Sequence, residues 1–457
     1  MAGLAGEVLQ GLGLADPVIR LGVTGLSRAG KTVFITSLVA NLMDRGRMAG
    51  MRAVADGSLR AAWLQPQPDD TVPRFDFERY LAAMTGPDPF WPEGTRHVSE
   101  LRLSLRLEPR GLLSGLRGPR TVHIDIVDYP GEWLLDLRLM EQDFAAWSAE
   151  VLARLPLRPA SAPFLDALAA LAPDAGFDEV LAQELTGLYA AHLHAAREAG
   201  WSDCTPGRFL LPGELAGSPA LTFAPLPESL RDGPLWRECA RRFEAYKARI
   251  VRPFFRDHFA RIDRQVVLVD VLGAIHSGPA AVEDMRRAMA AILSAFRPGR
   301  AGWLAQLVGA RRVERILFAA TKADHLHHQQ HPRLAAILSA LLREARDRAD
   351  FSGARTEALA IAALRSTTET MIERDGESLP AVRGTLLDGC RAALYPGELP
   401  DDPADLLTPA REGASAWLDA DYAVMNFAPA PSTLKPGDGP PHIRLDRAAE
   451  FLLGDRL

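Results

Sequence analysis

The stretch LGVTGLSRAGKTVF, residues 21–34, constrains the fold more than any other part of this 457-residue chain. Within it, Gly25, Gly30, Lys31 and Thr32 fit the pattern G-x-x-x-x-G-K-[ST]. Between a strand and a helix, such a loop binds phosphate through its backbone N–H groups and the helix N-terminus. The lysine reaches the β- and γ-phosphates, and the hydroxyl ligates Mg²⁺. We therefore predict a strand at 18–24, a phosphate loop and a helix at 32–44; the alternative is a chance match in an ordinary strand–turn–helix.

Arg28 stands in the middle of this loop, where many phosphate loops carry small residues. A guanidinium is planar and permanently charged, so it can meet two phosphate oxygens as charge builds in a transition state. One interpretation of Arg28 is therefore an arginine finger supplied by the loop itself. The other is that Arg28 points outward and pairs with a carboxylate.

A second motif lies at the end of the later of two runs with alternating polar and apolar residues, 98–107 and 121–131. Their link is too short for a parallel crossover, so we predict an antiparallel pair. The second run ends in Asp128-Tyr-Pro-Gly131, in which Asp128 can hold magnesium and the Gly131 N–H can meet a γ-phosphate. An Asp-Pro-Gly turn is the alternative. Glu132 comes next, where a water-orienting glutamine is common, and its charge repels a γ-phosphate, which predicts slow turnover or another water-positioning residue.

The third motif is Thr321-Lys322-Ala323-Asp324, directly after the apolar run 315–320. It fits [NT]-K-x-D. The carboxylate of Asp324 can accept hydrogen bonds from guanine N1–H and the exocyclic amine, a pair that adenine does not present. The stem of Lys322 can cover the face of the base. A simple turn at a strand end is the alternative.

The order of these motifs resembles the translation-factor-related class of GTPases. Proteins of this class carry a switch threonine that ligates magnesium, and Thr95 is the candidate here. Trp91 and Arg96, which flank it, can close over a nucleotide. Near the end of the last predicted strand, 357–364, the backbone of Ala363 and Leu364 can meet the guanine carbonyl.

The chain divides into three predicted parts. Residues 1–132 form the first part of an α/β P-loop core, and residues 261–457 form the second part and the C-terminal segment. Between them, residues 133–260 are rich in Leu, Ala, Glu and Arg at helical spacing, which predicts a large helical insertion. Within the second part, an apolar run predicts a buried parallel strand at 265–273, and 280–296 a helix. We read 65–95 as a long loop with short helical pieces.

Composition narrows the partners and the location. A net charge of −6 argues against nucleic acid as the main partner. Three scattered cysteines and the lack of a leader pattern favour the cytoplasm. The run of histidines at 325–331 admits a metal site, although it lacks a distant second ligand group, so a solvated loop is the reading we favour. The basic loop around Trp303 suits a membrane surface, a protein partner or, as we favour, a solvated face.

The chain resembles the YcjX family of P-loop proteins through GLSRAGKT at 25–32, WPEGTR at 91–96, DYPGEWLLDL at 128–137, VVLVDVLGA at 266–274, TKADH at 321–325 and the tail at 441–457. The resemblance implies a cytoplasmic guanine-nucleotide-binding protein tied to the stress response. By position, the family's nucleotide contacts fall on Ser27, Gly30, Lys31, Thr32, Val33, Trp91, Gly94, Thr95, Arg96, Lys322, Asp324, His325, Ala363 and Leu364. To these we add Gly25, Arg28, Ala29 and Thr321, which belong to the phosphate-loop and TKAD motifs.

The sequence thus predicts a GTPase that hydrolyses GTP to GDP and phosphate with Mg²⁺. Arg28, Lys31, Thr95, Gly131 and Glu132 are its candidate catalytic residues, and Thr32, Thr95 and Asp128 its candidate metal ligands. One alternative is a nucleotide-dependent scaffold that controls a protein partner through the helical insertion, with hydrolysis incidental. Another is an ATPase, against which the TKAD motif argues.

Overall fold

A computed structural model describes residues 16–25, 29–94, 97–109, 118–172, 176–294, 313–343, 354–414, 426–431 and 435–457. In these residues, seven strands form the central sheet, in the order β2-β3-β4-β1-β5-β6-β7. Their bounds are β1 Val18–Gly25, β2 Leu59–Gln65, β3 Ser99–Leu107, β4 Arg120–Asp128, β5 Arg264–Val269, β6 Arg315–Ala320 and β7 Arg355–Ala360. The predicted α/β class with a parallel-rich sheet is confirmed.

Strand directions follow from the pairing. Strands β4, β1, β5, β6 and β7 are mutually parallel, and β3 is antiparallel to both β4 and β2. The antiparallel pair predicted before Asp128 is therefore confirmed. Strand β5, RQVVLV, is buried along its whole length, as expected of a central parallel strand covered on both faces.

Each face of the sheet has its own apolar core. Val266 and Leu268 of β5 pack in one core with α2 (Lys31–Met43) and α18 (Leu445–Leu453). Val267 and Val269 point to the other face, because side chains alternate along a strand. There they pack with α12 (Val271–Ser277), α13 (Pro279–Ser294) and α15 (His331–Leu341).

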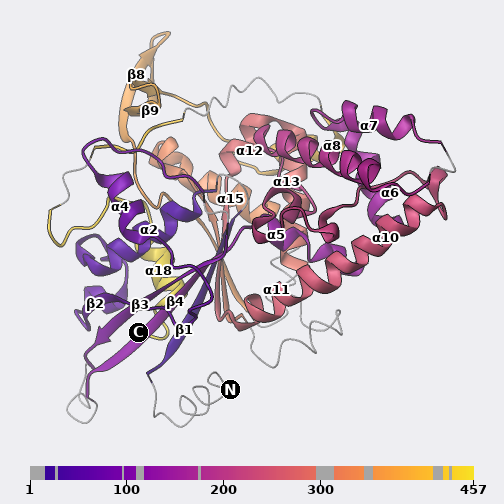
Figure 1. Cartoon of the computed structure of the whole chain (residues 1–457). Helices are drawn as coiled ribbons and strands as arrows, with labels where there is room; N and C mark the ends of the chain where they lie inside the picture. Colours follow the sequence, from indigo (N-terminus) through magenta and orange to yellow (C-terminus); the bar gives the residue numbers. More distant parts are fainter. Residues whose placement is uncertain are drawn as a thin grey trace.

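Helices fill the chain between β4 and β5. Figure 1 shows α6, α7, α8 and α10 gathered on the side of the sheet away from α2 and α4. We call residues 133–260 the helical segment; its domain boundaries remain a prediction. The helices of this region are α5 Glu132–Leu135, α6 Phe144–Arg154, α7 Ala162–Ala169, α8 Glu179–Glu198, α9 Gly207–Leu210, α10 Pro234–Tyr246 and α11 Arg252–Asp257. Asp143 is the N-cap of α6 and Asp178 is the N-cap of α8. Each side chain accepts a hydrogen bond from the backbone N–H three residues later, at Ala146 and Leu181.

Three further α-helices and a second sheet are present in the described residues. They are α3 Arg52–Ala55, α4 Phe77–Thr85, α17 Ala404–Glu412 and a small antiparallel sheet of β8 Thr368–Arg374, β9 Glu377–Thr385 and β10 Arg391–Leu394. The hairpin of β8 and β9 projects from the body in Figure 1.

One predicted strand is too long. The run 265–273 is a strand only to Val269, since the Asp270 side chain accepts a hydrogen bond from the Gly273 N–H (3.0 Å) and starts α12. An N-capping aspartate favours a helix start over strand continuation. Strand β2 is not among the predicted strands, because it is a half-exposed edge strand without clear alternation of apolar and polar residues.

Candidate functional site

The site lies at the carboxyl ends of the parallel strands. Because β1, β4, β5, β6 and β7 run the same way, the segments that follow them meet at one edge of the sheet. The pairing of Val23 with Asp128 places the end of β4 beside the start of the phosphate loop. The segments after β6 and β7 contain the TKAD motif and residues 361–367.

The described part of the phosphate loop is shaped by Gly30. Its φ of 80° is a left-handed conformation that suits glycine, and α2 begins at the next residue. Lys31 Nζ donates a hydrogen bond to the carbonyl of Gly25 (3.1 Å), so the ammonium lies over the loop. Ser27 and Arg28 lie outside the described residues.

Gly131 packs directly on this loop. A β-carbon at Gly131 would overlap the carbonyl oxygen of Gly25, so only glycine allows the approach. Asp128 is 1% exposed and Thr32 is 5% exposed at the same edge. A carboxylate and a hydroxyl are the hard oxygen donors that Mg²⁺ prefers, so this donor pair fits that ion. Thr95, the third predicted ligand, lies outside the described residues, as does Arg96.

The TKAD motif is held by its neighbours. Lys322 has a positive φ of 60°, and its ammonium pairs with the carboxylate of Asp270. The Thr321 N–H donates to the Val269 carbonyl (3.0 Å), fixing the motif to β5. Asp324 Oδ2 accepts from the N–H (2.8 Å) and hydroxyl (2.6 Å) of Ser366, which orients a buried carboxylate.

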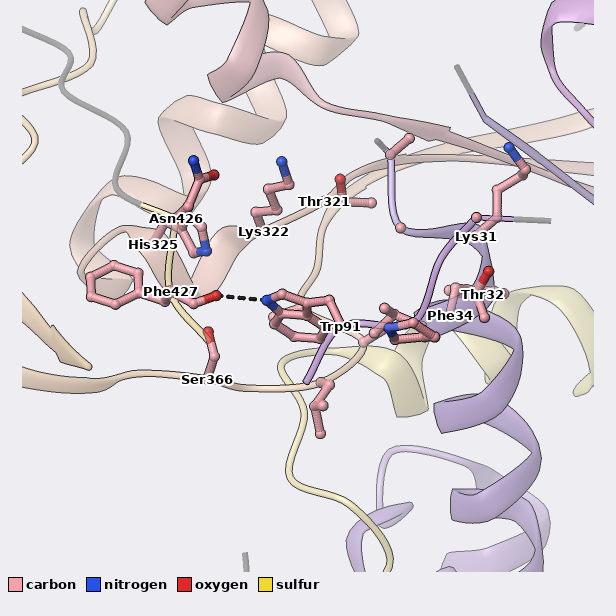
Figure 2. A pocket seen from close by; sticks show the side chains of 18 of the residues that line it. Lys31, Thr32, Phe34, Trp91, Thr321, Lys322, His325, Ser366, Asn426 and Phe427 are labelled. Carbon is pink, nitrogen blue, oxygen red and sulfur yellow. Dashed lines mark hydrogen bonds between the residues drawn. The ribbon is translucent and has the colours of Figure 1, made fainter. Parts of the chain in front are cut away.

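Aromatic residues from distant parts of the chain meet beside this motif. Trp91 Nε1 donates to the carbonyl of Phe427 (2.7 Å), as Figure 2 shows. The ring of Phe427 lies edge-on to that of His325, with centroids 5.3 Å apart. Burial lowers the pKa of His325, so this imidazole is neutral near pH 7.

A cavity of about 550 Å³ connects these groups, and we call it the edge cavity. Phosphate-loop, TKAD and Ala363-Leu364 residues all line it, so the structure brings together segments that the sequence only suggested. The predicted residues on its walls are Ala29, Gly30, Lys31, Thr32, Val33, Trp91, Gly94, Glu132, Thr321, Lys322, Asp324, His325, Ala363 and Leu364. Gly25, Asp128 and Gly131 are not among them.

Other wall residues were not anticipated. Ser366, Asn426 and Phe427 come from C-terminal segments without a recognised motif, and Leu387 follows β9. His194, Arg197 and Glu198 come from the end of α8 in the helical segment. The i, i+3, i+4 spacing of these three polar residues was the one available signal, since it places them on one helix face.

The arrangement joins two chemistries in one cavity. At the phosphate-loop end, Lys31 and a helix N-terminus can hold an anion. At the other end, the buried carboxylate of Asp324 can accept hydrogen bonds from N–H donors.

The histidine run has structural roles in the described residues. His331 Nε2 lies 2.7 Å from the Ala323 carbonyl oxygen, which fixes the turn after TKAD. His327, His328 and Glu369 are close enough to hold a cation, and Glu369 is the distant ligand that the sequence did not reveal. However, the hydrogen bond between His328 Nδ1 and Glu369 (2.7 Å) accounts for this cluster without a metal.

Two features bear on membrane contact. Among the residues that the structure describes, no helix combines the length and apolar character needed to cross a bilayer. The basic loop around Trp303, from Arg297 to Arg312, falls outside those residues.

Comparison with known proteins gives concordant matches. Residues 19–457 match the model of the YcjX-like family, DUF463. The chain is 38% identical over 464 residues to the Ras-like GTPase YcjX of Escherichia coli (strain K12), covering 97% of this chain and 96% of that protein. It is 36% identical over 471 residues to the Ras-like GTPase YcjX of Shewanella oneidensis, covering 97% and 95%.

Proposed function

Because the chain belongs to the YcjX-like family, we propose that it is a molecular switch that binds GTP and hydrolyses it to GDP and phosphate with Mg²⁺. Two curated relatives with matches covering 95% or more of both chains carry the name Ras-like GTPase. The association with stress and the cytoplasmic location rest on the family resemblance and belong to the same proposal.

One observation supports guanine nucleotide above all others. Lys31 and Asp324 lie on the walls of one cavity of about 550 Å³, which is within the range of small-molecule sites. In the proposed complex, the phosphates bind at Lys31 and the N-terminus of α2. The base meets Asp324, with the stem of Lys322 over its face.

Magnesium has a matching set of donors. Thr32 and Asp128 supply a hydroxyl and a carboxylate at the phosphate-loop end of the site, and Thr95 is the proposed third ligand. When bound, the ion neutralises charge on the β- and γ-phosphates.

Hydrolysis requires positioning and charge stabilisation more than covalent chemistry. The Gly131 N–H, beside Gly25, is the proposed γ-phosphate contact. Arg28 remains our candidate arginine finger. Glu132 replaces the common glutamine, so we expect slow intrinsic turnover.

A second function, a nucleotide-dependent scaffold, has its own support. Trp133, Leu134 and Leu135, which begin two residues after Gly131, are buried among the helices. Any movement of Gly131 on loss of the γ-phosphate must therefore disturb the packing of the helical segment. In this version, the helical segment signals to a protein partner and hydrolysis is incidental.

The test compares GTP, ATP and XTP. Wild-type protein should bind GTP tightly and ATP weakly, with Mg²⁺-dependent phosphate release from GTP. Asp324→Asn should shift preference toward XTP, because an amide donor suits the xanthine carbonyl. Nucleotide titrations measure the affinities, and phosphate-release assays measure turnover. Lys31→Ala removes the proposed phosphate-binding ammonium, so this control variant should not bind any of the three nucleotides tightly.

Equal turnover of ATP and GTP would contradict the guanine assignment. GTP binding without turnover, even with cell extract added, would favour the scaffold. If Asp324→Asn keeps full GTP affinity and gains none for XTP, the base is read elsewhere.

A further inference from the structure

The last turn of α8 brings charge from the helical segment to the edge cavity. His194, Arg197 and Glu198 line the cavity together with Lys31 and Thr32. Arg197 Nη2 lies 3.3 Å from Glu132 Oε1. The carboxylate of Glu132 is only 3% exposed, whereas the Arg197 side chain is 29% exposed and so has room to move.

This ion pair sits next to the phosphate loop. Lys31 Nζ contacts the carbonyl of Gly25, and Gly131 packs on that same carbonyl. Glu132 follows Gly131 directly and holds Arg197. A short chain of contacts thus leads from the lysine that meets the β- and γ-phosphates to a guanidinium carried by a helix outside the core sheet.

The positive charge of Arg197 can offset the negative charges of Glu132 and of a bound triphosphate. A buried carboxylate beside a phosphate site repels a triphosphate unless a cation offsets it. Arginine is suited to this task, because its planar donors can serve a carboxylate and a phosphate oxygen at once.

We propose that Arg197 binds the γ-phosphate of the nucleotide and that its ion pair with Glu132 holds it ready to do so. The inference rests on the proposed function and extends it: beside the Gly131 N–H, the helical segment supplies a charged group that distinguishes a triphosphate from a diphosphate. Loss of the γ-phosphate removes this contact and keeps the ion pair with Glu132, so the nucleotide state is passed directly to α8.

The experiment measures affinity for GDP and for a non-hydrolysable GTP analogue, with Mg²⁺, in variants of the full chain. Arg197→Ala should lower affinity for the analogue by about 10- to 100-fold, the effect of one charge-assisted contact, and change GDP affinity little. Glu132→Gln should act in the opposite direction and raise analogue affinity, because it removes a negative charge while its amide oxygen can still accept a hydrogen bond from Arg197. The double variant with both Arg197→Ala and Glu132→Gln should not recover wild-type affinity for the analogue, because it still lacks the guanidinium.

The control is Arg241→Ala on α10, which removes an arginine paired with Glu238 (2.7 Å) away from the cavity. It should leave both affinities unchanged. Equal losses for GDP and analogue in Arg197→Ala, or full rescue by Glu132→Gln, would show that Arg197 only balances Glu132 and would overturn the inference. If Arg197→Ala fails to fold, a fall in analogue affinity in Glu132→Gln overturns it. Wild-type protein that binds neither nucleotide refutes the proposed function itself.

Discussion

Ser366 fixes the direction of the Asp324 carboxylate through two hydrogen bonds to the same oxygen. Ser366→Ala removes the hydroxyl bond and keeps the backbone one. We expect GTP affinity to fall about tenfold, since a hydrogen bond to a charged group contributes roughly 1.5–3 kcal/mol and one bond remains. Titration with a fluorescent guanine nucleotide measures this, and Ser366→Thr, which retains a hydroxyl, is the matched control. Wild-type affinity in Ser366→Ala would mean that Asp324 is oriented without it.

At this scale, the sequence identified residues that belong to a motif and missed those that do not. Lys31 and Asp324 were predicted because the spacing of their motifs encodes a specific chemistry. Ser366 and Arg197 line the same cavity but were not predicted, because their contacts are with residues far away in the sequence, Asp324 and Glu132. No short sequence motif predicts a contact between residues so far apart in the chain.

At the scale of elements, the segment after Gly131 is attached to the surrounding helices by several buried contacts. Asp136 Oδ1 accepts from the Gly207 N–H (2.8 Å), and Tyr246 donates its hydroxyl to Oδ2. The guanidinium of Arg208 lies over the Trp133 ring, 3.2 Å from its centroid. This segment therefore cannot move without the helices around it.

The burial of Asp136 in this segment predicts a pH dependence of stability. Burial raises the pKa of Asp136 from 3.8 to about 7, so the folded state binds this proton more tightly than the unfolded state. The resulting stabilisation is fully present below pH 4 and is lost as the pH rises through 7, on the order of 4 kcal/mol in total. Asp136→Asn cannot titrate, so its free energy of unfolding should fall less than that of wild type across this window. Urea denaturation at several pH values gives the comparison, and parallel curves for the two proteins would contradict the assignment.

Strong apolar runs made β1, β5 and β6 predictable, although Asp270 shortened β5. Two elements with weaker apolar patterns, β2 and the hairpin of β8 and β9, were not predicted. Strand β2 is an edge strand, where half-exposed positions blur the alternation. The hairpin of β8 and β9 turns at Asp375-Gly376, both with positive φ. Asp-Gly between two strands is a strong hairpin signal, so this hairpin was predictable from the sequence.

Across the whole molecule, the C-terminal helix completes the core on one face of the sheet. Leu445, Leu452 and Leu453 of α18 are fully buried. The buried guanidinium of Arg264 on β5 donates to the Leu452 carbonyl (3.0 Å) and to Asp455 (3.0 Å). The end of the chain thus both fills the core and satisfies a charge inside it.

Leu452→Ala should therefore lower the free energy of unfolding by about 2–5 kcal/mol, the usual cost of a cavity in place of a buried leucine. Val180→Ala, at a position 71% exposed on α8, should change it by less than about 0.5 kcal/mol. Chemical denaturation of both variants measures the difference. A Leu452→Ala protein as stable as wild type would show that α18 is dispensable to the core.

The hydrogen bond from Trp91 to Phe427 joins residues 336 positions apart, and Asn41 at the end of α2 donates to the carbonyl of Pro440 (3.0 Å). The walls of the edge cavity likewise extend from Ala29 to Phe427. On the ribosome, the predicted phosphate loop emerges early, but the wall of the edge cavity stays incomplete until Phe427 has been made. A chain interrupted before Phe427 therefore lacks part of the cavity wall, and under the proposed function it should bind nucleotide weakly.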